Sequence, residues 1–184
     1  MIDLGAIDNS WTLFLDRDGV INHEKHEDYI HHWGEFKFYH GVKDAFKIFA
    51  KRFKYIIIVT NQKGVGKGVT KLEDVLTIHK NMQAEIEAAG GRIDKIYFCT
   101  DIESNNRKPN PGMGLQAIKD LPDIDPKKAI MVGNTLSDME FGRNIGVQTI
   151  FLPTTRPEVC LDDERIDAVY SSLQAFAIAI PTNP

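Results

Sequence analysis

The chain has 184 residues, of which 42% are hydrophobic, and its formal net charge at pH 7 is -4. This length and apolar content suffice for one well-buried domain, so residues 1–184 are predicted to form a single domain. The acidic balance argues against a general nucleic-acid binder and a membrane-surface protein, because both need a positive field over much of their surface. We expect no nucleic-acid or membrane partner and a monomeric protein.

Cysteine usage and the N-terminal residues bear on the compartment. The chain has only two cysteines, Cys99 and Cys160. Its first residues lack the basic start and the following apolar block of a secretory signal peptide. No apolar stretch approaches the roughly 20 residues that span a bilayer. A cytoplasmic protein is therefore expected.

Short apolar runs recur along the chain, with helical patterns between them. Runs of this length without polar alternation are typical of strands buried on both faces. The expected strands are residues 12–15, 55–60, 95–99, 129–132 and 147–152. The expected helices are residues 41–53, 72–89, 112–120, 137–144 and 171–180. Strands that alternate with helices predict an α/β fold with a Rossmann-like parallel sheet covered on both faces.

The longest segment without a clear period is residues 22–40, which is too short for a separate lid domain. Any cap over a site is therefore expected to be a loop. The segment holds five of the six histidines, with the pairs His23 and His26, and His31 and His32, at spacings that also occur in metal sites. No cysteine accompanies them, so a polar loop at the mouth of a site is the favoured interpretation.

Polar residues follow the apolar runs. DRDG follows the first run, TNQKGVGKG the second, and GNTLSD the fourth, while NNRKPNPG precedes the helix at 112–120. In parallel α/β sheets, ligands bind in the crevice outside the carboxyl ends of the strands. A carboxylate can attack phosphorus when Mg²⁺ and a lysine neutralise its repulsion from the phosphate. Asp16 would be this nucleophile, and Asp18 would protonate the leaving alkoxide and then take a proton from water.

The set LFLDRDGVIN, VTNQ, RKPNPGM and VGNTLSD, in this order, resembles the haloacid dehalogenase-like phosphatases. The combination is far more specific than any single motif. Within these phosphatases, it is most similar to the branch of heptose-1,7-bisphosphate and histidinol-phosphate phosphatases. The resemblance implies a Mg²⁺-dependent phosphatase of small phosphorylated metabolites that forms an aspartyl phosphate. A heptose-type sugar bisphosphate is the first candidate substrate and histidinol phosphate the second.

The resemblance also implies roles for individual residues. Asp16 is the nucleophile and a Mg²⁺ ligand, and Asp18 is the acid/base and offers its backbone carbonyl to the metal. Thr60 holds a phosphoryl oxygen, and Lys108 bridges the phosphate and Asp16. A hydroxyl at a strand end and a lysine beside an anionic nucleophile are compatible with these roles. The expected substrate-binding residues are Asn61, Gln62, Lys67 and Arg107.

The fourth motif departs from the family pattern, which usually reads Gly-Asp with a further Asp four residues later. Here Gly133-Asn134 is followed by Asp138, and Thr135 stands where the branch often has Lys. Asn134 can still offer a neutral oxygen to Mg²⁺. Asp138, about one helical turn further, can compensate directly or through water. Asn134 and Asp138 therefore join Asp16 and Asp18 as candidate metal ligands, with weakened metal affinity expected.

A second departure concerns zinc, because relatives in this branch often carry a cysteine-rich loop before RKP. Cys99 stands alone in the corresponding CTDIESNNRKP, so no zinc is expected. A non-catalytic phosphosugar-binding domain is the rival from another class, since the change at Asn134 removes a charge on which turnover depends. A nucleic-acid end phosphatase is disfavoured by the acidic balance and the lack of a basic stripe.

Overall fold

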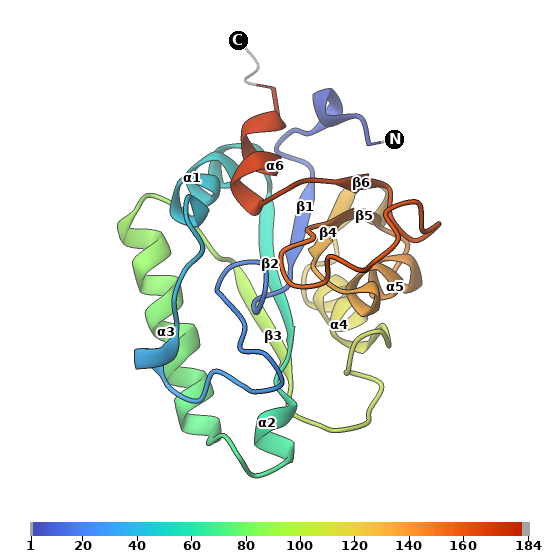
Figure 1. The fold of residues 1–184 in the computed structure, drawn as a ribbon. Helices are drawn as coiled ribbons and strands as arrows, with labels where there is room; N and C mark the ends of the chain where they lie inside the picture. Colours follow the sequence, from blue (N-terminus) through green and yellow to red (C-terminus); the bar gives the residue numbers. More distant parts are fainter. Residues whose placement is uncertain (1, 182–184) are drawn as a thin grey trace.

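The computed structural model describes residues 2–181, which form a six-stranded sheet in the order β3-β2-β1-β4-β5-β6. The strands are β1 (Thr12–Leu15), β2 (Tyr55–Asn61), β3 (Lys95–Cys99), β4 (Ala129–Gly133), β5 (Gln148–Phe151) and β6 (Ala168–Val169). Every neighbouring pair is parallel. The chain moves outward from β1 to β3 and then returns to the other side of β1 to form β4 (Figure 1). The order in which the chain adds strands therefore reverses between β1 and β4. Ligand crevices form at such a reversal in folds of this kind.

Helices cover both faces of this sheet, as expected. They are α1 (Val42–Arg52), α2 (Lys63–Gly66), α3 (Leu72–Ala88), α4 (Gly112–Asp120), α5 (Leu136–Asn144) and α6 (Leu173–Ala179). Short 3-10 turns lie at Leu4–Ala6, Trp33–Glu35 and Pro126–Lys128. In Figure 1, α1 and α3 lie on one side of the sheet, and α4 and α5 lie on the other. The predicted α/β class is thus confirmed.

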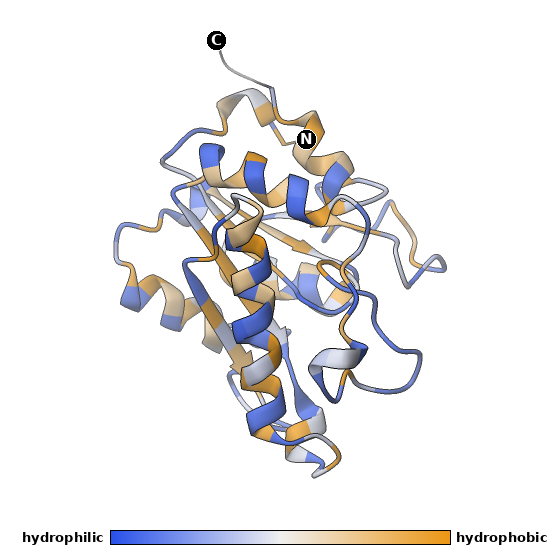
Figure 2. Cartoon of the chain, turned by 90° about the vertical axis from the view of Figure 1, so that its left-hand side faces the viewer, coloured by the Kyte–Doolittle hydropathy of each residue, from blue (hydrophilic) through white to orange (hydrophobic). Residues whose placement is uncertain are grey.

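The alternation of side chains along the strands builds a core on each face. Leu13 and Phe14 are consecutive in β1, yet they belong to different hydrophobic clusters, because successive strand residues point to opposite faces. Phe46 of α1 packs into the cluster of Leu13, and Phe141 of α5 packs into that of Phe14. Figure 2 shows the layer of α1 and α3, in which hydrophilic and hydrophobic residues alternate, as in helices with one buried face.

Two short elements differ from the sequence expectation. The strand β6 has two half-buried residues, too few to leave an apolar run in the sequence. The helix α2 spans KGVG, whose glycines favour a loop over a helix. Between β1 and α1, the chain forms a loop with one 3-10 turn, so the cap is a loop as predicted. Within residues 2–181, no helix is long and apolar enough to cross a membrane.

Candidate active site

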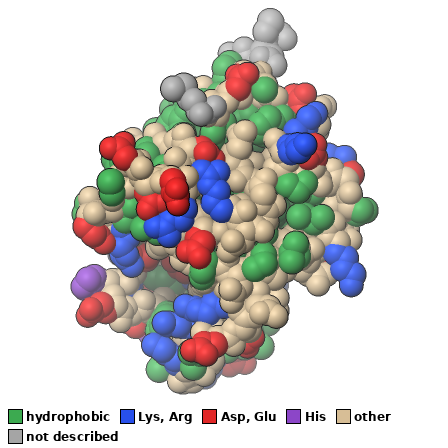
Figure 3. Space-filling model, turned by 90° about the vertical axis from the view of Figure 1, so that its right-hand side faces the viewer, with side chains coloured by type: hydrophobic (Ala, Val, Ile, Leu, Met, Phe, Trp, Pro, Cys, Tyr) green, Lys and Arg blue, Asp and Glu red, His purple; other side chains and the backbone are tan. Residues whose placement is uncertain are grey.

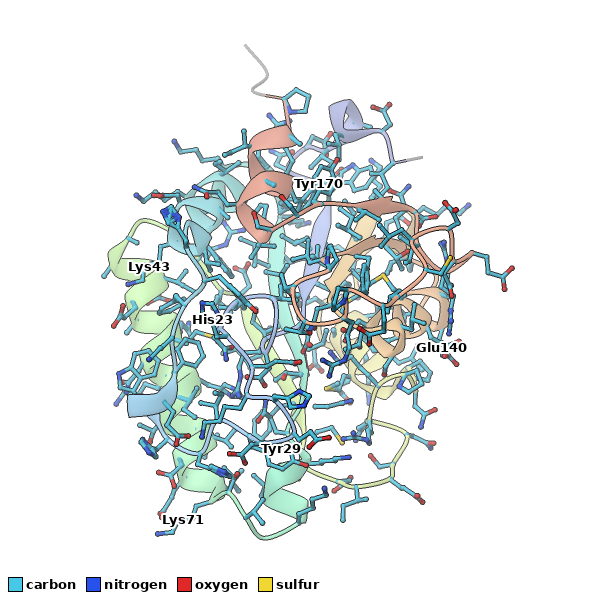
Figure 4. The ribbon with its side chains drawn as sticks, viewed as in Figure 1. His23, Tyr29, Lys43, Lys71, Glu140 and Tyr170 are labelled. Carbon is cyan, nitrogen blue, oxygen red and sulfur yellow. The ribbon has the colours of Figure 1, made fainter. Side chains whose placement is uncertain are left out.

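The loops after the strands surround a cavity of about 520 Å³ at the carboxyl end of the sheet. Every residue singled out from the sequence as catalytic, substrate-binding or metal-binding lines this one cavity: Asp16, Asp18, Thr60, Asn61, Gln62, Lys67, Arg107, Lys108, Asn134 and Asp138. Figure 3 shows a hollow on this side of the molecule, with basic and acidic side chains around it. The loop of residues 22–40 closes one wall, and its Tyr29 lies over the lower end of the sheet in Figure 4.

A buried ion-pair triad lies at one side of the cavity. The Nζ atom of Lys108 lies 2.9 Å from Oδ1 of Asp16 and 2.6 Å from Oδ1 of Asp138. The Lys108 and Asp138 side chains are each 2% exposed, whereas Asp16 is 12% exposed and faces the cavity. Lys108 is therefore a fixed positive charge beside Asp16, the more accessible of the two carboxylates for a ligand.

Burial has opposing effects on this triad. It raises the pKa of the Asp16 carboxyl to about 7, because Lys108 offsets only part of the desolvation and Asp138 adds a like charge. Burial alone would lower the pKa of Lys108, but its ion pairs with Asp138 and Asp16 hold that pKa above the usual value. Lys108 is therefore charged at neutral pH, and a further cation near Asp16 would favour its nucleophilic, ionised form.

Asp138 is held by the chain on both of its oxygens. Its Oδ2 accepts hydrogen bonds from the backbone N–H of Asn134 at 3.2 Å and from Thr135, whose N–H and hydroxyl lie at 3.1 and 2.8 Å. The N–H contact from Thr135, together with the hydrogen bond of 3.3 Å that the Asp138 N–H donates to the Thr135 hydroxyl, forms a capping box at the start of α5. Its Oδ1 accepts from Lys108. Each oxygen of Asp138 therefore has a partner within the protein, and its contribution to a metal site, directly or through water, stays a prediction.

Asn134 is fully buried at the end of β4 and lines the cavity. Its Nδ2 donates to the hydroxyl of Thr155 at 2.6 Å, and its buried Oδ1 has no hydrogen-bond partner among residues 2–181. A Cβ atom on Gly19 would lie 2.0 Å from this Nδ2, so the close approach of the DRDG loop requires glycine, which also has a φ of +84°. The unpartnered amide oxygen suits a hard cation such as Mg²⁺.

Asp18 is the centre of a second polar network. Its carboxylate accepts two hydrogen bonds of 3.0 Å from Nη2 of Arg17, and one of 2.9 Å each from Asn22 and Gln62. Burial alone would raise the pKa of Asp18, but the Arg17 charge and these hydrogen bonds hold it below the usual value. Gln62 also donates to the Thr60 hydroxyl at 3.0 Å. The network ties the carboxyl end of β2 to the DRDG loop.

Among the predicted substrate-binding residues, Asn61 is hydrogen-bonded to the protein backbone, whereas Lys67 and Arg107 lie on the cavity wall. Asn61 exchanges two hydrogen bonds of 3.0 Å with the backbone of Lys108, so it fixes the position of that lysine. Lys67 lies 5.6 Å above the ring of Tyr29 at the cavity wall. The Nη1 atom of Arg107 is buried without a hydrogen-bond partner in the described part of the chain. Arg107 and Lys67 therefore place positive charge on the cavity wall, and their binding of an anionic substrate stays a prediction.

Some residues of this region were missed by sequence reasoning. Arg17, Asn22 and His79 hold Asp18 directly or through one another, and Glu24 pairs with Arg156 at 2.8 Å on the cavity wall. The sequence gives a weak sign of a polar role for Arg17 and Asn22. Arg17 lies within DRDG, and Asn22 directly follows the apolar residues after it. Glu24, His79 and Arg156 carry no local signal, because their partners are distant in the sequence.

Two histidines of the loop 22–40, His23 and His31, have ordinary partners in the structure. His23 packs on Tyr39 with ring centroids 3.9 Å apart, and His31 bonds to Asp28 and Thr70 at 3.0 and 2.7 Å. Among the described residues, no group of three or more His, Cys, Asp and Glu side chains is arranged to hold a metal ion. The absence of zinc stays a prediction.

Comparison with known proteins agrees with this architecture. A family model described as HAD-hydrolase-like matches residues 105–176. The D-glycero-α-D-manno-heptose-1,7-bisphosphate 7-phosphatase of Mycobacterium bovis is 35% identical over 94% of this chain and 92% of its own length. The D-glycero-β-D-manno-heptose-1,7-bisphosphate 7-phosphatase of Haemophilus influenzae is 34% identical over 88% of this chain and 92% of its own.

A solved structure shows the same fold. The D,D-heptose 1,7-bisphosphate phosphatase of B. bronchiseptica, complexed with magnesium and phosphate, superposes with a TM-score of 0.82 at 25% identity, covering 91% of this chain and 96% of that one. The fold and the carboxylate pair after β1 define a haloacid dehalogenase-like phosphatase, a phosphoric monoester hydrolase. The chain belongs to the D-glycero-D-manno-heptose-1,7-bisphosphate 7-phosphatase family, which confirms the resemblance drawn from its motifs.

Proposed function

We propose that this phosphatase removes the 7-phosphate of a D-glycero-D-manno-heptose 1,7-bisphosphate, with Asp16 as the nucleophile. The observation that carries the proposal is the contact of Asp16 with the buried Lys108 on the wall of the cavity. A lysine fixed at 2.9 Å stabilises the ionised carboxylate and the negative charge of an incoming phosphate. The family relatives named above act on this class of sugar.

The site fits a magnesium ion. Asp16, the backbone carbonyl of Asp18 and Oδ1 of Asn134 are the oxygens that would hold it, and the Asn134 oxygen is buried without another partner among residues 2–181. Bound there, Mg²⁺ supplies positive charge that neutralises the phosphate and favours the ionised Asp16. We propose that Asp138 serves this site by holding Lys108 rather than as a direct ligand, since both of its oxygens are engaged.

The chain's own residues account for two half-reactions. Asp18 takes up a proton when the phosphate dianion binds beside it. The Asp16 carboxylate then attacks phosphorus to form an aspartyl phosphate, while the bond to the leaving sugar oxygen breaks and Asp18 supplies its proton to that oxygen. Asp18 then takes a proton from water, which attacks the phosphorus and releases phosphate and free Asp16. Thr60 donates its hydroxyl to a phosphoryl oxygen, and Lys108 stabilises the charge on the transferring group in both steps.

The remaining cavity walls suit a sugar with a second phosphate. Arg107 and Lys67 supply positive charge for the anomeric phosphate, and Asn61 and Gln62 set the positions of Lys108 and Asp18. The carboxylates Glu24, Glu27 and Asp28 on the loop 22–40 can accept hydrogen bonds from sugar hydroxyls. We further propose that residues 1–184 form one domain, because both core clusters share the single sheet, and that the protein is a monomer in the cytoplasm.

The test is phosphate release from a substrate panel. The panel contains the α and β anomers of the heptose 1,7-bisphosphate, histidinol phosphate and simple sugar phosphates, each with Mg²⁺ or a chelator. We expect Mg²⁺-dependent release from one heptose anomer, with ³¹P NMR showing that the anomeric phosphate remains on the product. Asp16→Asn should abolish release, whereas Asp123→Asn, a surface carboxylate paired with Lys54, should retain it.

The outcomes separate the alternatives. Preferred release from histidinol phosphate would contradict the heptose proposal but retain the aspartyl-phosphate chemistry. Release that survives in Asp16→Asn would refute the role of Asp16. Phosphate binding by a folded protein without release from any member of the panel would replace the proposal with a phosphosugar-binding function.

A further inference from the structure

The side chain of Arg17 lies inside the protein, although its two sequence neighbours line the cavity. Arg17 is 0% exposed. Its Nη2 donates to both oxygens of the Asp18 carboxylate at 3.0 Å, and its Nε donates to Oδ1 of Asp18 at 3.3 Å. A buried guanidinium needs a partner for each donor, because an unpaired buried donor is strongly unfavourable. The donors that face Asp18 are satisfied by that carboxylate, which leaves Nη1 on the far side.

His79 provides the partner for Nη1. Its Nε2 lies 3.1 Å from Nη1 of Arg17, across 62 positions of sequence. His79 comes from α3, is 5% exposed, and packs edge-on against Phe98 of β3, with ring centroids 5.2 Å apart. Burial and the adjacent Arg17 charge lower the pKa of His79 to about 3. The ring is therefore neutral, and Nε2 can accept the hydrogen bond from the guanidinium.

The three side chains form a line from the helix layer to the cavity. His79 fixes one end of the guanidinium, and the planar fork of Arg17 then fixes both oxygens of Asp18. Asn22 and Gln62 each donate to one oxygen of Asp18, whereas Arg17 donates to both. A guanidinium without its His79 contact could rotate about its long side chain, and it would then no longer fix the orientation of the carboxylate. General acid catalysis depends on the placement of the proton donor to within a fraction of an ångström.

We propose that His79 is a positioning residue for the phosphatase reaction, which acts through Arg17 to hold the Asp18 carboxyl at the leaving-group oxygen. This inference rests on the proposed role of Asp18 as the general acid. His79 does not line the cavity among the described residues. Its loss should therefore impair leaving-group protonation specifically, and not the attack by Asp16.

The experiment compares two substrates that differ in their need for a proton. The sugar alkoxide of the heptose bisphosphate needs protonation as it leaves, whereas the nitrophenolate of p-nitrophenyl phosphate is a weak base that departs without it. The parameter is kcat/KM, which reports the steps up to the first irreversible one and so excludes hydrolysis of the aspartyl phosphate. The variants are Asp18→Asn, His79→Leu and His79→Gln, with Ile78→Ala as the control.

The expected pattern follows from the geometry. Asp18→Asn should lose kcat/KM far more with the bisphosphate than with p-nitrophenyl phosphate. His79→Leu keeps the packing volume but removes the acceptor, so it should lose about 10²-fold with the bisphosphate and less than about threefold with the nitrophenyl ester. His79→Gln retains an acceptor and should recover most of the loss. Ile78→Ala, buried on the same helix, should destabilise the fold without changing the ratio of the two substrates.

Each contrary result identifies what fails. If Asp18→Asn loses both substrates equally, the proposed role of Asp18 fails, and the inference fails with it. If Asp18→Asn shows the expected difference but His79→Leu lowers both substrates equally, has no effect or raises kcat/KM, only the inference about His79 is overturned. Failure of His79→Gln to recover activity also overturns it. Should His79→Leu not fold, His79→Asn, whose shorter amide cannot reach Arg17, takes its place against His79→Gln.

Discussion

Replacing Lys108 with methionine tests the buried triad, because methionine keeps the length of the side chain and removes its charge. The Nζ atom lies 2.6 Å from Asp138 and 2.9 Å from Asp16. At an effective dielectric constant of about 20, Coulomb's law assigns each contact about 6 kcal/mol of attraction before desolvation. Since removal of one partner leaves buried charge unpaired, we expect Lys108→Met to lose about 3–5 kcal/mol of unfolding free energy at pH 8.

The loss of unfolding free energy caused by Lys108→Met should be smaller at acidic pH. Without Lys108, the pKa of Asp16 rises further, so the folded state of the variant binds a proton that the unfolded state releases above about pH 4. The unfolding free energy of the variant therefore falls as pH rises, and the gap to wild type is wider at pH 8 than at pH 5. The stabilisation of phosphoryl charge is also lost, which should lower kcat by about 10²–10³-fold.

Urea titrations at pH 5 and pH 8, with phosphate release measured in parallel, provide the assay. Lys47→Met is the matched control, because Lys47 pairs with Asp44 on the surface, where such pairs contribute little. Equal urea midpoints for Lys108→Met and wild type at pH 8 would refute the reasoning that Lys108 is the buried counter-ion of both carboxylates.

Other predictions follow from the same site. Asn134→Asp should tighten Mg²⁺ binding in calorimetry, because a carboxylate adds a charge to the ligand set; an unchanged affinity would show that this position does not face the metal. In metal-free protein, the pKa of Asp16 is raised from 3.8 to about 7, so its contribution to stability is present below pH 4 and is lost as pH rises to 7. Because the lowered pKa of His79 gives the opposite pH dependence between about pH 3 and 6.5, the fall should be measured as the difference in unfolding free energy between wild type and Asp16→Asn. Mg²⁺ should reduce this fall, and a difference that stays constant with pH would contradict the burial of Asp16. Gly19→Ala should destabilise the protein more than Gly68→Ala, for which about 1–2 kcal/mol is expected from the positive φ alone. Both glycines have positive φ, but a Cβ at Gly19 meets Asn134 at 2.0 Å, whereas no described atom lies within 4 Å of one at Gly68. Equal urea midpoints for the two variants would count against the close contact.

Much of the site was predictable because parallel strands place their carboxyl ends along one edge of the sheet. Asp16 follows β1, Thr60 lies near the end of β2, and Asn134 follows β4, so residues separated by tens of positions share one cavity. The apolar runs predicted these strands, and the polar loops after them predicted the site. The same logic failed for β6, because two half-buried residues leave no pattern.

The partners of these residues were not predictable in the same way. Asp138 is a candidate metal ligand by its spacing, but the contacts of the α5 capping box and Lys108 with both of its oxygens were not predicted from the sequence. His79 looks in the sequence like one more position on the buried face of α3, between Ile78 and Met82. Only the packing of α3 against the sheet brings its ring to Arg17.

The sequence by itself determined the α/β class, the family and the candidate catalytic and metal-binding side chains at the cavity, since strand periodicity and strand-end motifs are local properties of the chain. The tertiary structure alone decided which charges face one another: Lys108 between Asp16 and Asp138, Arg17 between Asp18 and His79, and an unpartnered Asn134 oxygen within the described chain. These pairings depend on distances of about 3 Å between segments far apart in sequence, and such distances are set only when the helices pack on the sheet.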